Sequence, residues 1–291
     1  MQVEGFFDEV TGTVSYLVFD PASRACAVID PVADFDLHTG RLAYAQAERI
    51  AARMQALNAE LEWVLETHVH ADHLSAAPFF RDHFAARIGI GARLPEVRRA
   101  FAPMWPAEDA RAAVASERFD RFFDDGDQFR IGELVVRVLA TPGHTPACVS
   151  YLVADARAEN FAAFVGDTLF MPDAGTARCD FPGGDAGTLY RSVRRLLSLP
   201  ADTRLYTCHD YPPAGRAPCF QSTVAEQRAA NVHVRDGIGQ ADFVALRQGR
   251  DATLCAPKLM LAAMQVNLRA GTLPEPESHG VRYLKIPLDV A

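Results

Sequence analysis

A seven-residue stretch, residues 67–73 with the sequence THVHADH, constrains this chain more than any other feature. It holds His68, His70, Asp72 and His73 in the spacing H-x-H-x-D-H, and it follows the apolar run LEWVL. Side chains 68 and 70 project to the same side while the strand persists, and Asp72 and His73 follow as the chain turns into a helix. Imidazole nitrogen and carboxylate oxygen are the usual ligands of zinc and non-haem iron, so this loop predicts a metal site.

Three further polar clusters supply partners for the histidine loop, and each follows an apolar strand. They are His144 in TPGHTP, Asp167 in VGDTLF and His209 in TCHDY. Taken singly, each has a plain structural interpretation: a turn cap, a helix N-cap and a buried hydrogen-bonding residue. Because all of them follow strands, we expect the sheet ends to bring them to one rim, which is the candidate site.

The order of apolar patterns predicts an α/β chain that begins with a hairpin. TVSYLVFD and ACAVID alternate apolar and polar residues around the turn PASR. Helical spacing then alternates with short apolar strands. We predict helices over residues 41–60 and 74–86, and strands within residues 61–67, 87–94, 134–144, 160–170 and 203–213.

The sequence patterns after residue 220 predict helices. STVAEQRAANVHV, residues 222–234, leads into residues 242–271, where APK separates two helical patterns. No Gly/Ser/Pro-rich linker precedes this part. We therefore predict a catalytic domain over residues 1–220, and a helical cap over residues 221–291 that is integral to the same domain.

Composition excludes several classes of function. A net charge of −8 and the absence of long Lys/Arg clusters argue against nucleic-acid binding. No stretch has the apolar length of a membrane span, and the N-terminus lacks an export signal, so we expect a cytoplasmic protein. The six scattered cysteines form no C-x-x-C pair, which disfavours disulfides and a cysteine zinc site. Apolar residues in the C-terminal helical patterns are compatible with a homodimer.

The order H-x-H-x-D-H, G-H-T, G-D-T-L-F and a late histidine resembles the metallo-β-lactamase superfamily. That resemblance implies an αβ/βα sandwich with metals at one edge of its two sheets and, here, a C-terminal helical extension. Within the superfamily, GTARCDFPGGD, CHDYPP, STVAEQR and DPVADFDLHTGR resemble the persulfide dioxygenases, in particular the bacterial branch called β-lactamase hydrolase-like.

The persulfide dioxygenase resemblance implies one iron(II) per chain, held by His68, His144 and Asp167. Three protein ligands leave octahedral positions open for a substrate sulfur and for O₂. His70, Asp72, His73 and His209 would then be hydrogen-bond partners around the metal. Zinc or another divalent metal can replace iron in such ligands.

Binuclear members of the superfamily, such as glyoxalase II, use the same residues differently. One metal takes His68, His70 and His144, the other takes Asp72, His73 and His209, and Asp167 bridges them around a nucleophilic hydroxide. Because this sequence keeps every residue of the binuclear set, a zinc thioesterase or lactonase is the alternative. A metal-binding protein that only senses or sequesters sulfur species is a third hypothesis, disfavoured by the complete ligand set.

The substrate implied by the resemblance is glutathione persulfide, which reacts with O₂ and water to give glutathione and sulfite. Its carboxylates require cationic anchors, and the candidates are Arg178, with Tyr211 and Arg216 beyond His209. Each also has a structural interpretation, as an ion pair or as packing. Cys179 and Cys208 lie next to the motifs, but the sequence shows no general base beside them. We therefore predict that both are buried structural thiols.

Overall fold

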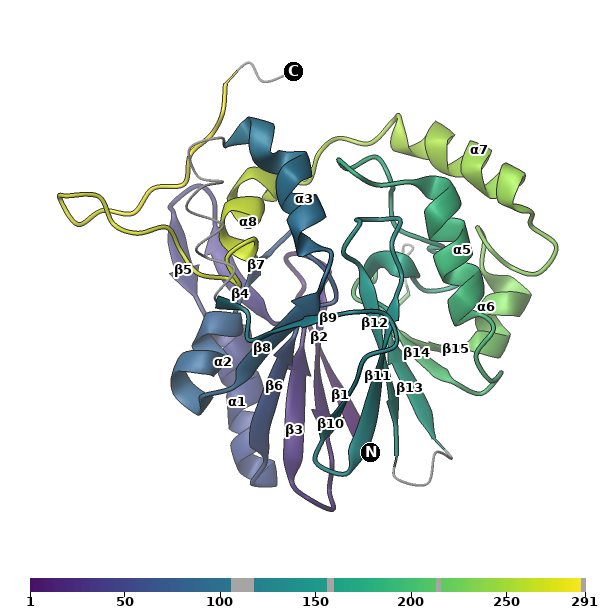
Figure 1. Ribbon diagram of the computed structural model, residues 1–291, viewed down its shortest axis with the longest axis horizontal. Helices are drawn as coiled ribbons and strands as arrows, with labels where there is room; N and C mark the ends of the chain where they lie inside the picture. The colour runs from purple at the N-terminus through teal and green to yellow at the C-terminus, as the bar shows by residue number, and fades with distance from the viewer. Residues whose placement is uncertain (106–117, 156–159, 213–215, 289–291) are drawn as a thin grey trace.

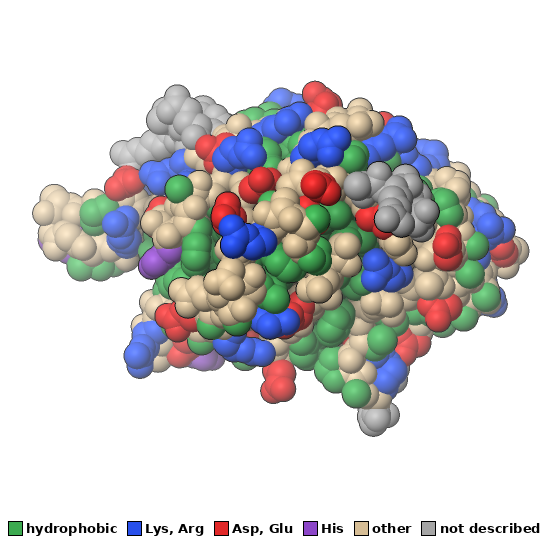
Figure 2. Space-filling model, turned by 90° about the horizontal axis from the view of Figure 1, so that it is seen from below, with side chains coloured by type: hydrophobic (Ala, Val, Ile, Leu, Met, Phe, Trp, Pro, Cys, Tyr) green, Lys and Arg blue, Asp and Glu red, His purple; other side chains and the backbone are tan. Residues whose placement is uncertain are grey.

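The computed structural model describes residues 1–105, 118–155, 160–212 and 216–288. Within these residues two six-stranded sheets pack face to face, and helices cover the outer face of each (Figure 1). This is the predicted αβ/βα sandwich. Acidic and basic side chains are interspersed over the face seen from below in Figure 2.

The first sheet has the strand order β1-β2-β3-β6-β8-β9. Strands β1 to β3 pair antiparallel, which confirms the predicted N-terminal hairpin, and β3, β6, β8 and β9 run parallel. Its strands are β1 (Gln2–Phe7), β2 (Val14–Phe19), β3 (Ala25–Ile29), β6 (Glu60–Leu65), β8 (Arg87–Gly91) and β9 (Arg121–Phe123).

The second sheet follows the chain order from β10 to β15. Its pairs are antiparallel except β13 with β14, which are parallel because α5 (Ala186–Leu196) crosses between them. Its strands are β10 (Gln128–Ile131), β11 (Leu134–Ala140), β12 (Val149–Ala154), β13 (Phe161–Phe164), β14 (Arg204–Tyr206) and β15 (Gln221–Thr223).

Side-chain alternation along the strands builds three apolar layers. In β2, Tyr16 belongs to the core between the two sheets, whereas Leu17 belongs to the core under the helices outside the first sheet. In β11, Val138 lies in the central core and Leu139 lies under α5. The central strands β2 and β3 are buried along their whole length, so the predicted metal ligands of this chain lie at the strand ends and not within these strands.

Helices α1 (Ala45–Leu57), α2 (Ala77–Phe84) and α3 (Leu94–Phe101) belong to the first half of the chain. The predicted start of a helix at residue 41 was wrong, because β5 (Arg41–Ala43) pairs with β4 (Val32–Asp36). The Asp34 carboxylate then accepts a hydrogen bond from the Ala45 N–H and fixes the first turn of α1. The helix ends at Asn58, whose φ of 49° is left-handed.

The helix predicted over residues 74–86 starts later, because β7 (Leu74–Ser75) pairs with β4. The strand predicted over residues 87–94 ends at Gly91, and α3 was not predicted. A short 3-10 turn, η1 (Ala102–Met104), continues α3. Local patterns miss these pairings because they depend on contacts with distant strands.

The C-terminal part contains α6 (Val224–Ala230), α7 (Gln240–Asp251) and α8 (Met260–Asn267). Residues 221–223, predicted as helical, form β15, so the second sheet continues across the proposed boundary at residue 220. Phe243 of α7 packs in the core under α5, and Ala263 of α8 packs in the core of the first helical layer. Residues 289–291 of the predicted cap lie outside the described residues. Among the described helices, none combines the length and hydropathy needed to cross a membrane.

Candidate metal centre

The histidine loop follows β6 and is anchored by Asp30, which sits at the end of the neighbouring strand β3. The Thr67 N–H and hydroxyl donate to the two carboxylate oxygens of Asp30 at 2.7 and 2.8 Å. All three histidines of the loop are buried, with exposed fractions of 1% or less. The Asp30 anchor was not predicted, although the sequence signal existed in the final Asp of ACAVID.

One group of ligand atoms joins His68, His144 and Asp167. Oδ2 of Asp167 lies 3.8 Å from Nε2 of His68 and 3.6 Å from Nε2 of His144. His144 Nδ1 lies 2.7 Å from the Arg178 carbonyl, which can only accept, so Nδ1 carries the proton and Nε2 is left as the electron-pair donor. These three residues, separated by up to 99 positions, can therefore bind one metal ion.

The turn that carries Asp167 needs the glycine before it. Asp167 lies in η3 (Gly166–Thr168), a 3-10 turn after β13. Gly166 has a φ of 51°, and a Cβ there would lie 2.5 Å from the Thr67 hydroxyl oxygen. A side chain at this position would push the Asp167 turn away from the histidine loop.

Further ligand-type side chains surround Asp72, whose Oδ2 lies 3.3 Å from Nδ1 of His73. Nε2 of His209 lies 3.3 Å from Oδ2 of Asp72 and 3.4 Å from Oδ1 of Asp167. The two oxygens of Asp167 thus face different groups, which is the arrangement of a carboxylate that can bridge two metals. The Thr13 hydroxyl lies 3.4 Å from Nδ1 of both His73 and His209 and 3.3 Å from Asp72 Oδ2.

Thr13 belongs to the N-terminal hairpin and was missed by sequence reasoning. Its backbone forms a β-bridge with His209, and its side chain is fully buried. If its oxygen accepts from Nδ1 of both imidazoles, both Nε2 atoms remain free to bind a metal. No local sequence signal marks this threonine, because its partners at the metal centre lie at least 59 residues away.

His70 is held from its far side by two carboxylates. Its Nε2 lies 3.0 Å from Asp30 and 3.2 Å from Glu66. The tautomer with Nε2–H is therefore favoured, and Nδ1 remains without a hydrogen-bond partner among the described residues. Sequence reasoning did not identify Glu66.

The donor set fits a divalent metal ion. Five buried polar atoms in this cluster have no hydrogen-bond partner among the described residues, and a buried orphan of this kind normally costs about 1–3 kcal/mol. They are His68 Nε2, His70 Nδ1, His73 Nε2, Asp167 Oδ1 and His209 Nε2. One metal ion bound by His68, His144 and Oδ2 of Asp167 accounts for the first of these atoms, and a second metal ion would account for the other four.

The pKa values of the buried histidines shift in different directions. Burial, reinforced by His70 and His144, holds the pKa of His68 well below its usual value, so His68 presents a neutral imidazole. Burial also opposes a charge on His70 and His209, but neighbouring carboxylates prevail. Asp30 raises the pKa of His70, and Asp167 with Asp72 raises the pKa of His209.

A cavity of about 530 Å³ opens over the metal centre, and we call it the arginine pocket. Arg178, Arg247 and Arg250 line it together with Phe170, Phe181 and Tyr211. The Tyr211 ring stacks on the His209 ring at 5.5 Å between centroids. The pocket thus pairs aromatic walls with guanidinium groups beside the ligand cluster.

Of the predicted substrate residues, two are engaged elsewhere. Arg178 lines the pocket, but its guanidinium makes a double contact with Asp180 and donates to the Cys255 carbonyl. Arg216 does not line this pocket and pairs with Asp173 and Asp210. The buried thiols Cys179 and Cys208 have pKa values raised by burial, which disfavours a nucleophilic role.

Sequence reasoning missed two arginines of the pocket, Arg247 and Arg250. Arg247 is buried against Asp251, whereas Arg250 is exposed and approaches the His233 ring at 3.3 Å. Among the described residues, no carboxylate lies within 4.0 Å of the Arg250 guanidinium. The three-residue spacing of these arginines on a helix was the available signal.

Comparison with known proteins places these features in a family. The family model described as the metallo-beta-lactamase superfamily matches residues 8–209. A probable metallo-hydrolase of Burkholderia pseudomallei is 57% identical over 99% of both chains. A beta-lactamase hydrolase-like protein of Agrobacterium fabrum is 48% identical over 99% of this chain, which spans 65% of that relative. Glyoxylase B2 of Dictyostelium discoideum is 43% identical over 99% of this chain and 97% of its own.

Two further comparisons concern ETHE1 proteins. The crystal structure of ETHE1 from Myxococcus xanthus is 31% identical and superimposes with a TM-score of 0.73, covering 94% of this chain and all of that chain. The human mitochondrial persulfide dioxygenase ETHE1 is 29% identical over 91% of this chain and 87% of its own. The likeness therefore extends past residue 209 into the C-terminal helices.

Proposed function

The chain belongs to the metallo-β-lactamase superfamily, and from this premise we propose that it is a persulfide dioxygenase that oxidises glutathione persulfide at a single iron(II). The observation that carries the proposal is the structural match with ETHE1 of Myxococcus xanthus, which covers that whole chain. It includes most of the C-terminal part that supplies the arginines over the metal centre. Family membership already indicates a metal-dependent enzyme, whichever of the two reactions it catalyses.

His68, His144 and Asp167 would hold the iron, because their free nitrogens and Oδ2 converge on one point. Iron(II) in two imidazoles and one carboxylate supplies open positions and the redox chemistry of O₂. In the balanced reaction the terminal sulfur of glutathione persulfide gives up four electrons to O₂. One O₂ and one water are consumed, and glutathione and sulfite with its two protons are released.

The protein residues around this triad orient the ligands and the substrate. The Arg178 carbonyl fixes the His144 tautomer, and the Thr13 hydroxyl orients His73 and His209. Arg250 would bind a carboxylate of glutathione, because its guanidinium faces the pocket without a carboxylate partner of its own among the described residues. The aromatic walls exclude water from the substrate sulfur.

A binuclear zinc hydrolase is the second candidate, and a specific observation favours it. Asp72 lies beside both His73 and His209, and Oδ1 of Asp167 faces His209. Two metals of a binuclear centre lie about 3.5–4 Å apart, which a bridging carboxylate permits. The names of the Burkholderia and Dictyostelium relatives point to this class of enzyme.

Metal analysis of anaerobically purified protein, with oxygen uptake on glutathione persulfide, tests the proposal. We expect one iron per chain and stoichiometric sulfite release. Two tightly bound metals per chain, hydrolysis of S-lactoylglutathione and no oxygen uptake would overturn the proposal and support the hydrolase.

A further inference from the structure

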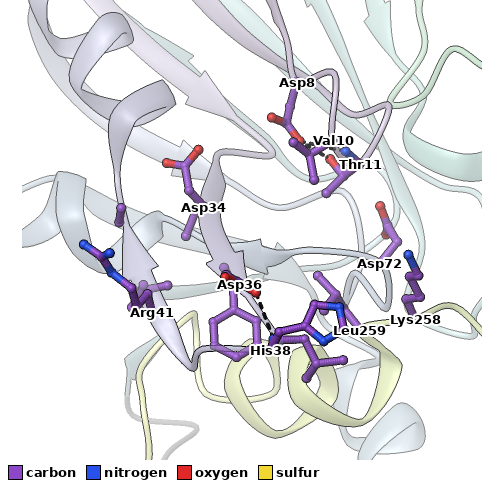
Figure 3. Close-up of a pocket in the computed structure, with 15 residues that line it drawn as sticks. Asp8, Val10, Thr11, Asp34, Asp36, His38, Arg41, Asp72, Lys258 and Leu259 are labelled. Atoms are coloured by element: carbon purple, nitrogen blue, oxygen red, sulfur yellow. Dashed lines mark hydrogen bonds between the residues drawn. The ribbon is translucent and has the colours of Figure 1, made fainter.

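A second cavity lies on the other side of Asp72, and Figure 3 shows the side chains that line it. We call it the aspartate groove. It encloses about 750 Å³ between the loop after β1, the β4–β5 ribbon and the start of α8. Its polar lining includes Asp8, Asp34, Asp36, His38, Arg41 and Lys258, and Val10 and Leu259 contribute apolar walls.

The charges of the aspartate groove are of both signs and are incompletely paired. Oδ2 of Asp34 accepts from the Ala45 N–H, whereas Oδ1 accepts no hydrogen bond from the described residues. Lys258 is exposed, and among the described residues no carboxylate lies within 4.0 Å of its ammonium group. The groove therefore contains a carboxylate oxygen and an ammonium group that have no charged partner among the described residues.

The groove adjoins the metal centre directly. Asp72 lines both cavities, and the neighbouring residues Pro257 and Lys258 line the arginine pocket and the aspartate groove respectively. The aspartate groove is lined by more acidic than basic side chains, Asp8, Asp34, Asp36 and Asp72 against Arg41 and Lys258, whereas in the arginine pocket three arginines stand beside Asp72, Asp167 and Asp173. A dipolar ligand that lies across the metal has one favoured orientation in this field.

We propose that the aspartate groove binds the amino-acid end of the substrate, the γ-glutamyl group of glutathione, while the glycine carboxylate lies in the arginine pocket. This inference rests on the proposed function only in its choice of a glutathione derivative. The γ-glutamyl end carries an α-ammonium group and an α-carboxylate. The ammonium group donates a hydrogen bond to the Asp34 carboxylate, and the α-carboxylate accepts one from Lys258. The sulfur in the middle of the tripeptide then lies at Asp72 and the metal.

The binding test uses the metal-loaded protein and S-methylglutathione, which has no reactive persulfide. Calorimetric titration compares it with the glutaryl analogue, in which hydrogen replaces only the α-ammonium group. We expect the wild-type protein to bind the analogue about tenfold more weakly, within the range for a lost charge-assisted hydrogen bond. Asp34→Asn should bind both probes with nearly the same affinity, because the amide side chain keeps an oxygen to cap α1 but loses the charge.

Lys258→Gln tests the carboxylate contact, and Lys285→Gln is its matched control. Lys285 is the other lysine of the chain and does not line the groove. We expect Lys258→Gln to weaken S-methylglutathione binding about tenfold with unchanged metal content, and Lys285→Gln to have no effect. Equal binding of both probes by the wild type, or full affinity in Asp34→Asn and Lys258→Gln, would overturn the inference.

Failure of the proposed function gives a different result. If the enzyme is a glutathione thioesterase, oxygen uptake is absent but the ammonium preference and its loss in Asp34→Asn persist. If it is a persulfide dioxygenase without this subsite, oxygen uptake is present but the variants match the wild type with both probes. If no glutathione derivative binds, the substrate assignment and the inference are both wrong.

Discussion

The environment of His233 predicts that the free energy of unfolding decreases as the pH falls. The Thr176 N–H donates to its Nδ1 at 3.0 Å, and an Arg250 N–H approaches its Nε2 at 3.3 Å. Burial, together with Arg247 and Arg250, lowers its pKa from 6.5 to about 4. The unfolded chain therefore binds a proton at His233 below pH 6.5, whereas the folded protein resists it until about pH 4.

The sign and size of the effect follow from this difference. The stability contributed by the neutral ring is complete above about pH 7 and is lost as the pH falls toward 4. At pH 5, about 1.5 units below the unfolded pKa, the loss is about 2 kcal/mol at 1.4 kcal/mol per unit. No discount for solvent screening applies, because the His233 side chain is only 2% exposed.

Urea unfolding of wild type and His233→Gln at pH 7 and pH 5 measures this loss. Glutamine keeps an acceptor for the Thr176 N–H but does not titrate. The wild type should lose about 2 kcal/mol more than the variant between the two pH values, and metal loss at low pH cancels in that difference. A difference below about 0.5 kcal/mol would refute the assignment of a depressed pKa to His233.

Three further predictions concern the metal centre and the arginine pocket. Arg250→Ala should raise KM for glutathione persulfide about 10-fold to 100-fold with unchanged iron content, because it removes a charge-assisted hydrogen bond. Arg178→Ala is the comparison, and an equal rise in KM there would contradict the distinction between the free and the paired arginine. His144→Ala should lose iron and oxygen uptake together, whereas His209→Ala should keep one iron and lose about 10-fold to 100-fold in activity. Metal analysis of both variants distinguishes a mononuclear site from a binuclear one. Loss of a second metal from His209→Ala would favour the hydrolase. Gly166→Ala should lower thermal stability and metal affinity together, because its φ of 51° and the 2.5 Å approach to Thr67 leave no room for a methyl group. Unchanged values in calorimetry and chelator competition would show that the turn can move.

Local patterns predicted an α/β chain with polar residues at one rim, and the sandwich itself was implied by the resemblance to the metallo-β-lactamase superfamily. Strand periodicity places His68, His144, Asp167 and His209 at strand ends, and the packing of buried sheets then brings those ends together. The same reasoning failed for β5, whose partner is β4 rather than the neighbouring helix. It failed for α3 because only the structure shows where β8 stops.

The arginines that line the pocket were harder to predict, for a physical reason. Arg178 and Arg250 have the same chemistry, and only their partners separate them. Arg178 meets Asp180 two positions away, whereas Arg250 projects from α7 beside the His233 ring. Thr13 is likewise defined by side chains from distant loops. Which charge is paired and which is free depends on tertiary contacts that residue spacing does not record.

The metal count depends on charge balance rather than on which ligands are present. Four carboxylates, Asp30, Glu66, Asp72 and Asp167, lie beside the histidines of this centre. Two divalent ions would balance their charge with all imidazoles neutral. One divalent ion leaves two negative charges, and His70 and His209 are the histidines whose pKa values the carboxylates raise. Without a metal ion these carboxylates thus favour a positive charge on His70 and His209, the charge that a second metal ion would otherwise supply.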